Sequence, residues 1–153
     1  LTGQANALLV SPHFELGRHR RIVLNPELSR LDWLVGGSQR RVCHSLEVEA
    51  RGIRLVLANL HASKDPDGAV AAAEIERAAS FLASAERCVL CGDFNLPRHE
   101  VAGFSPPIDG IDEILVRGFE LELGPDVWPD DRRRIDGTVL SDHAPVEAVI
   151  TST

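Results

Sequence analysis

The sequence has no methionine, although translation starts with one, so we expect a processed product, a cleaved fragment or an excised piece of a longer protein. It also has no long apolar run. The longest candidate is interrupted by Arg54 and Asn59, and none approaches the ~20 residues that a membrane-spanning helix needs. A membrane-spanning protein is therefore not expected.

Cysteine is scarce as well: the chain has three, and an odd number does not build a disulfide framework. Cys88 and Cys91 have the spacing of a CxxC motif, but residues three apart on a strand point to opposite faces. This spacing on a strand argues against a shared zinc ion or a redox pair. Reduced, partly buried thiols favour a cytoplasmic location.

Positive charge is also in short supply, because the formal net charge is −7 at pH 7. Proteins that hold nucleic acid by bulk electrostatics have basic surfaces, so this class is disfavoured. A nuclease that uses a divalent metal ion is still compatible with the charge. Three local basic clusters either face a phosphate or are solvated loop charge. They are Arg18-His19-Arg20-Arg21, Arg40-Arg41 and Arg132-Arg133-Arg134.

What the chain does contain is typical of one soluble α/β domain: it has 153 residues, of which 44% are hydrophobic and 25% charged. Apolar runs and alternating patterns predict strands, and a stripe of alanines with Val70, Ile75 and Leu82 predicts a helix over residues 69–85. Arg51-Gly52 predicts a tight turn between two strands. Strands are expected at residues 6–10, 22–24, 40–50, 53–61, 88–91, 111–116 and 145–150, and a surface loop at 124–134.

Two of these elements carry more detailed expectations. Asp65 or Asp67 is expected to cap the helix, and Glu74 on the helix is expected to face water. The alternation within residues 40–50 predicts one shared face for five side chains. They are Val42, His44, Leu46, Val48 and Ala50.

Polar side chains stand at the ends of several predicted strands. Carboxylate oxygens are hard metal ligands, and an imidazole titrates near neutral pH. Groups of this kind are the ingredients of metal-assisted hydrolysis. The candidates are Asn59 and His61, Asp93 and Asn95, Asp112, and Asp142 and His143.

Four motifs occur in a fixed order along the chain: Asn59-x-His61, Gly92-Asp93-Phe94-Asn95, Ile111-Asp112 and Ser141-Asp142-His143-x-Pro145-Val146. In this order, each beside an apolar strand, they resemble the motifs of the endonuclease/exonuclease/phosphatase superfamily. The resemblance extends from about Asn6 to Ile150. It implies a DNase-I-like four-layer α/β/β/α sandwich that hydrolyses phosphoesters with Mg²⁺ or Mn²⁺.

The resemblance also implies a general base. His143 would activate water, and Asp112 would orient its imidazole and stabilise the imidazolium. Arg134-Ile135-Asp136 spells a similar motif, so Asp136 is an alternative to Asp112. Asp112 is preferred because its strand continues, and because Asp136 is too near His143 in the sequence to reach it from a neighbouring strand.

The remaining roles concern the metal and the phosphate. The resemblance implies that Asp142 binds the divalent metal, and that Asp93 and Asn95 position the nucleophile and the phosphate or bind a second ion. His61 would hydrogen-bond the phosphate or help the leaving group. The plainer alternatives are that Asp142 satisfies a loop backbone and that His61 ends a strand at the surface. Four other histidines match no motif and are expected to be structural: His13, His19, His44 and His99.

Members of the superfamily carry two further strands upstream of the segment that corresponds to residues 6–10, and the second ends in a glutamate that binds the metal. We therefore expect residues 1–153 to be the carboxyl-terminal portion of a single domain whose amino-terminal strands are missing. The missing segment or self-association would then cover the sheet. The rival interpretation is a non-catalytic or incomplete domain that binds a partner through its uncovered sheet. The motifs are equally compatible with nucleic acid, a small phosphoester or a lipid headgroup as substrate.

Overall fold

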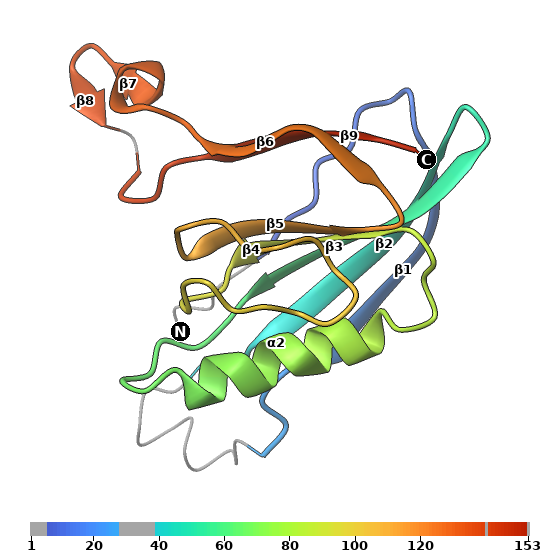
Figure 1. The fold of residues 1–153 in the computed structure, drawn as a ribbon, viewed down its shortest axis with the longest axis horizontal. Coiled ribbons are helices and arrows are strands. Elements are labelled where there is room, and N and C mark those ends of the chain that lie inside the picture. The colour runs from blue at the N-terminus through green and yellow to red at the C-terminus, as the bar shows by residue number, and fades with distance from the viewer. Residues whose placement is uncertain (1–5, 28–38, 140, 153) are drawn as a thin grey trace.

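One central sheet organises the chain, of which the computed structural model describes residues 6–27, 39–139 and 141–152. The elements are β1 (Glu15–Val23), β2 (Val42–Ala50), β3 (Ile53–His61), α2 (Ala69–Phe81), β4 (Cys88–Asp93), β5 (Asp112–Arg117), β6 (Glu120–Val127), the 3-10 turn η1 (Asp130–Arg133), β7 (Arg134–Ile135), β8 (Thr138–Val139) and β9 (Val146–Thr151). The strands of the sheet lie in the order β1-β2-β3-β4-β5. In Figure 1, α2 lies along one side of this sheet and the paired strands β6 and β9 lie on the other.

The described residues thus form three layers: the helix, the central sheet and the β6–β9 pair (Figure 1). The α/β class expected from the sequence is confirmed. No helix in this part of the chain has both the length and the apolar character needed to cross a membrane.

The hairpin between β2 and β3 is confirmed. Ala50 pairs with Ile53, and the two residues between them have positive φ angles, 53° at Arg51 and 76° at Gly52. Two-residue turns of this kind match the twist of the strands they join. β3 then runs parallel to β4, so α2 makes the crossover between them.

The helix begins as the sequence predicts, because two aspartates accept hydrogen bonds from its first amides. Asp65 accepts from the amides of Val70 and Ala71, at 3.0 and 3.1 Å, and Asp67 accepts from that of Ala69 at 3.2 Å. These contacts satisfy donors that have no partner inside the helix.

Glu74 does not face water, so that prediction is wrong. Its side chain is buried, and its two carboxylate oxygens accept from the backbone N–H of Ser63 at 2.6 Å and from the Ser63 hydroxyl at 2.8 Å. A buried carboxylate is tolerated when donors satisfy it. Glu74 therefore ties α2 to the segment that follows β3.

The core lies between α2 and the sheet. Its largest fully buried apolar side chains include Phe94, Leu24, Leu60, Ile75 and Leu90. Burying a side chain of this size contributes about 1.5–3 kcal/mol relative to leaving it in water.

The face predicted for residues 40–50 is only partly right. Val48 is buried, but His44 and Leu46 are half-buried. Cys43 and Ser45, on the opposite face, are buried as well, because they lie on the side of the sheet that α2 covers. Both faces of β2 are covered to some degree, and such a strand gives no clean alternation.

Cys88 and Cys91 do point to opposite faces. Cys88 is part of the core with α2 and lies 3.3 Å from a guanidinium nitrogen of Arg117, whereas the Cys91 sulfur faces the amide of Asn59. All three cysteines are free thiols. Burial raises the pKa of the Cys43 thiol to about 12, so this group is unreactive at neutral pH.

Several predicted bounds are wrong: α2 ends at Phe81 and not at residue 85, and β1 covers Glu15–Val23 and not only residues 22–24. Residues 6–10 form no strand, and Leu9 is 97% exposed; no described strand offers them a ladder of hydrogen bonds. The predicted loop at 124–134 is partly strand, because β6 continues to Val127. Gly124 and Pro125 lie where the pairing of β6 with β9 shifts register, which is a common place for both residue types.

Candidate active site

Three polar side chains lie in one row because neighbouring strands carry them. His61 on β3 pairs with Asp93 on β4, and Asp93 pairs with Asp112 on β5. Residues paired across strands share a face of the sheet. The carboxyl ends of β3 and β4 and the start of β5 therefore meet at one edge with all three groups.

The backbone around Asp93 allows little freedom. Gly92 has a φ of +133°, and a Cβ atom there would lie 1.9 Å from the carbonyl oxygen of Leu60. On the other side, Phe94 is fully buried and its N–H donates to the Ile111 carbonyl at 2.7 Å. The glycine is needed for close approach, and the phenylalanine anchors the chain.

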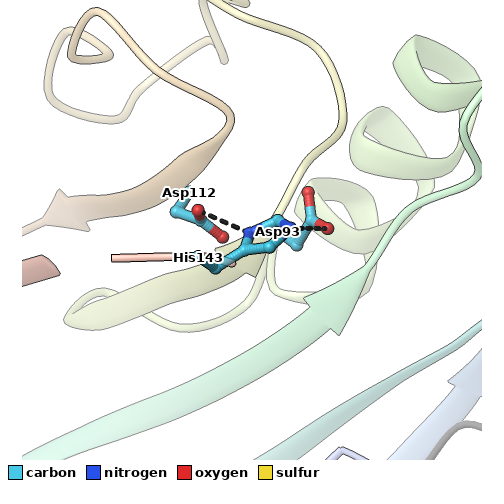
Figure 2. Close-up of side chains that lie close together, drawn as sticks. All are labelled: Asp93, Asp112 and His143. Carbon is cyan, nitrogen blue, oxygen red and sulfur yellow. Dashed lines mark hydrogen bonds and ion pairs between the residues drawn. The ribbon is translucent and has the colours of Figure 1, made fainter. Parts of the chain in front are cut away.

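His143 reaches this row from the loop before β9. Its Nδ1–H donates to Asp112 Oδ2 at 2.8 Å, and its Nε2 lies 4.0 Å from Asp93 Oδ2. Figure 2 shows the imidazole between the two carboxylates. The hydrogen bond to Asp112 raises the pKa of His143 above its ordinary value, and the charges of Asp112, Asp93 and Asp142 act in the same direction.

His61 is shifted the other way. Its Nε2 lies 3.4 Å from Asp93 Oδ2, which favours the charged form. Burial has the larger effect and lowers the pKa of His61, and the positive charge of Arg41 adds to the lowering. Asp93 thus lies near two imidazoles whose pKa values are shifted in opposite directions. The shift favours the neutral form of His61 and the protonated form of His143.

The other two residues predicted to bind metal lie differently. Asn95 is next to Asp93: its N–H donates to Asp93 Oδ1 at 2.9 Å, and its side-chain amide donates to the Ala62 carbonyl at 3.0 Å. Asp142 is exposed and lies outside the group formed by Asp93, Asp112 and His143. Its role as a metal ligand stays a prediction.

Asp112, and not Asp136, makes the hydrogen bond to His143. Asp136 lies in the exposed turn between β7 and β8, with a φ of 49°. The two similar motifs therefore occupy different places, one on the central sheet and one on a surface ribbon.

A divalent cation fits the donor set of this site. One ligand atom each from Asp93, Asp112 and His143 lies within 4.8 Å of the others. Carboxylate oxygens suit Mg²⁺ and similar hard cations, and an imidazole nitrogen suits several divalent ions, so these residues would be able to hold such an ion. Asp112 and His143 already bond to each other, which leaves Asp93 best placed to hold an ion.

Arg41 is a functional candidate that the sequence left undecided within a basic cluster. It is half-buried at the start of β2, where its N–H donates to Asn25 Oδ1 and its carbonyl accepts from Leu24 N–H, both at 2.9 Å. The carboxylates of Glu74 and Asp93 act electrostatically on its guanidinium group. The sequence signal for this role was the position of Arg41, one residue before β2, because β2 neighbours the strand that carries His61.

Other features lie apart from this site. His19 and His44 bond to each other at 3.1 Å, and His99 pairs with Glu76 at 3.2 Å. A hollow of 540 Å³ near the C-terminal end of α2, lined by Phe81 and Arg87 among others, contains none of the candidate residues. The site is thus identified by its chemistry and not by the depth of a cavity.

No model of a protein family matches the sequence, and a comparison with curated proteins found no match. Solved structures do match its fold. An endonuclease/exonuclease/phosphatase family protein from Bacteroides thetaiotaomicron matches with a TM-score of 0.62 and 16% identity, covering 92% of this chain and 66% of that one. A mannosyl-6-phosphatase from the same organism matches with a TM-score of 0.60 and 16% identity, covering 91% and 67%. TDP2 from D. rerio, complexed with a single-strand DNA product, matches with a TM-score of 0.62 and 15% identity, covering 92% and 69%.

The chain spans about two thirds of the length of these structures. At such low identity, the likeness lies in the path of the backbone. The resemblance stated from the four sequence motifs is confirmed at the level of the fold: this chain has the fold of the endonuclease/exonuclease/phosphatase proteins.

Proposed function

We propose that the chain hydrolyses phosphoesters with a divalent metal ion, and that His143 is the base that activates water. The observation that supports this most strongly is the imidazole of His143 between two carboxylates, 2.8 Å from Asp112 and 4.0 Å from Asp93. A general base must be held in a fixed orientation, and hydrolysis of a phosphoester needs charge neutralisation at its oxygens. Groups suited to both tasks meet here.

Each residue has a distinct role in this proposal. Asp112 accepts the Nδ1–H of His143, which leaves Nε2 to take a proton from water, and it stabilises the imidazolium that forms. Asp93 holds Mg²⁺ or Mn²⁺, with Asn95 and Asp142 as further ligands. When bound, the ion supplies Lewis-acid neutralisation of the phosphate oxygens.

Two further groups favour an anionic substrate. His61 in its neutral form still donates one N–H, and its position beside Asp93 suits a contact with a phosphate oxygen or with the leaving group. Arg41 contributes a permanent positive charge next to the same carboxylate.

The substrate class follows from charge. Among proteins of this fold, one is bound to a single-strand DNA product and another is a mannosyl-6-phosphatase, so the fold occurs with both nucleic acid and sugar phosphates. The net charge of −7 disfavours long duplex DNA, whose binding depends on release of counterions by basic surfaces. We therefore propose a small phosphoester or a single-stranded end as substrate.

The first experiment is hydrolysis of bis(4-nitrophenyl) phosphate, 4-nitrophenyl phosphate and a single-stranded oligonucleotide by the purified complete domain that contains residues 1–153. We expect turnover that a chelator abolishes and that added Mg²⁺ or Mn²⁺ restores. Turnover that survives thorough chelation would contradict the metal-dependent mechanism. The ratio of diester to monoester rates identifies the substrate class.

Replacing Asp112 by asparagine tests the orienting role. We expect kcat to fall by about 10–100-fold, because the imidazole loses its charged partner. In the metal-free chain, the pKa of His143 measured by NMR should fall towards the ordinary 6.5. Folding raises the pKa of His143, so its pairing with Asp112 stabilises the folded state below pH 6.5. This stabilisation is lost as the pH rises through the pKa that His143 has in the folded state.

The matched control is Asp136→Asn, which changes the similar motif on the β7–β8 turn. Asparagine tolerates the positive φ there, so the fold should be unaffected. Equal loss of activity in the two variants would contradict the proposal that Asp112 orients His143.

Replacing Asp93 by asparagine tests the metal site independently of turnover. Titration with Mn²⁺, followed by calorimetry or by the electron paramagnetic resonance of the free ion, should show affinity at least ~10-fold weaker than in the unchanged chain, because a charged oxygen ligand is lost. Asp126→Asn, at an exposed position of β6, should bind as the unchanged chain does. If Asp93→Asn binds equally well, Asp93 is not a ligand.

The second candidate function is a non-catalytic binding module, and one observation favours it. Apolar side chains of the β6–β9 pair are exposed, 63% at Leu123 and 45% at Val149. Surfaces of this kind often bind partners. The Mn²⁺ titration separates the two candidates, because a pure binding module should take up no ion specifically.

A further inference from the structure

The loop that carries His143 is tied to the 3-10 turn η1 by an arginine. Arg132, Arg133 and Arg134 follow one another, yet the side chain of Arg133 is only 20% exposed, compared with 48% for Arg132 and 44% for Arg134. In Figure 1 the segment from β7 to β8 projects beyond the sheets, so a well-covered arginine beside it is unexpected. Arg133 is covered because it faces the loop before β9.

The contacts of Arg133 form a short chain that ends at His143. Its Nη1 donates to the Ser141 carbonyl at 3.1 Å, while its Nε and Nη2 donate to Asp130 Oδ1 at 2.9 and 2.6 Å. The Ser141 hydroxyl in turn accepts from the backbone N–H of His143 at 3.2 Å. Two hydrogen bonds therefore connect the guanidinium group to the backbone of the proposed base.

The neighbouring arginines make different contacts. Arg132 pairs with Glu147 at 2.7 Å and lies over the ring of Trp128, with 3.9 Å from its central carbon to the ring centre. Arg134 donates to the Gly137 carbonyl at 3.0 Å and lies 3.6 Å from Asp130. Within the described residues, Arg133 is the arginine of this cluster that hydrogen-bonds to the segment 141–145, so the cluster is neither simply solvated nor a single phosphate-facing patch.

We propose that Arg133 is a positioning residue, which fixes the turn from Ser141 to His143 so that the imidazole points at Asp112. This inference rests on the proposed function for its catalytic meaning. The planar guanidinium group suits the task, because one edge is held by the carboxylate of Asp130 while another nitrogen orients a carbonyl. Without it, the turn keeps its Ser141–His143 bond but loses its anchor to η1.

The experiment compares Arg133→Gln, Arg133→Lys and Arg134→Gln in the full chain. We expect Arg133→Gln to lower kcat by about 10-fold with KM within roughly twofold, the size expected when one charge-assisted hydrogen bond is lost. Arg133→Lys should recover part of kcat, because an ammonium group can still reach one carbonyl. Arg134→Gln, which removes a donor from the same turn, should leave kcat unchanged.

Hydrogen exchange of the peptide 141–146 gives a readout that needs no activity. Exchange there should be faster in Arg133→Gln by about 10-fold, with Arg134→Gln like the unchanged chain and the peptides of the central sheet unaltered in both. Equal behaviour of Arg133→Gln and Arg134→Gln, in exchange or in kcat, would overturn the proposal. If the unchanged complete domain hydrolyses no phosphoester, the proposed function fails, while the exchange data still decide whether Arg133 holds this loop.

Discussion

Replacing His143 by alanine is expected to lower kcat for phosphoester hydrolysis by about 10²–10⁴-fold, the usual contribution of a general base. KM should change little, and thermal stability should fall only at acid pH, where protonated His143 pairs with Asp112, because the side chain is 39% exposed and its removal opens no cavity in the core. The rate of the unchanged chain should rise with pH as His143 loses its proton, since only the neutral imidazole can accept one. That rise should be missing in the variant.

The matched control is His13→Ala, at an exposed position before β1 that takes no part in the site. It should retain full activity under the same conditions. A His143→Ala chain that still turns over at the rate of the control, with the same dependence on pH, would refute the assignment of the base.

Replacing Gly92 by alanine is expected to destabilise the fold by roughly 2–6 kcal/mol, which combines backbone strain with overpacking. The φ of +133° is reserved for glycine, and the added Cβ would lie 1.9 Å from the Leu60 carbonyl oxygen, which is backbone and cannot turn away. Urea unfolding followed by circular dichroism measures the change. Because β3 and β4 would have to separate next to His61 and Asp93, the variant should also bind Mn²⁺ less well.

Gly110→Ala serves as the control for Gly92→Ala. At Gly110 an added Cβ has no neighbour within 4 Å, and the φ there lies outside the glycine-only range. Its unfolding midpoint should match that of the unchanged chain. If Gly92→Ala were equally stable, the close approach of β4 to β3 would not be a constraint on the sequence.

The row of candidate residues could be predicted because its signals are local. Each polar group directly follows or precedes an apolar strand, and the edges of neighbouring strands bring such positions together. The same reasoning favoured Asp112 over Asp136. Asp112 begins an apolar strand that continues into the sheet, whereas Asp136 follows a run of charged residues in a loop. The bond of 2.8 Å between Asp112 and His143 agrees with that preference.

The wrong expectations arose where a residue's environment is set by distant parts of the chain. Glu74 reads as a solvated helix residue, but Ser63 supplies two donors that allow its burial. β1 was predicted only over residues 22–24, because most of this edge strand is exposed on both faces and has no alternation. Arg133 looks like its neighbours in the sequence, and only the position of Ser141 distinguishes it.

Three members of the site are held by the ladder of the central sheet, whereas His143 comes from a connecting segment. Segments of that kind open with a smaller free energy than strands inside a sheet. The hydrolysis that we propose and the folded state therefore have separate thresholds, and mild heat or dilute denaturant should abolish the hydrolysis while the central sheet remains folded.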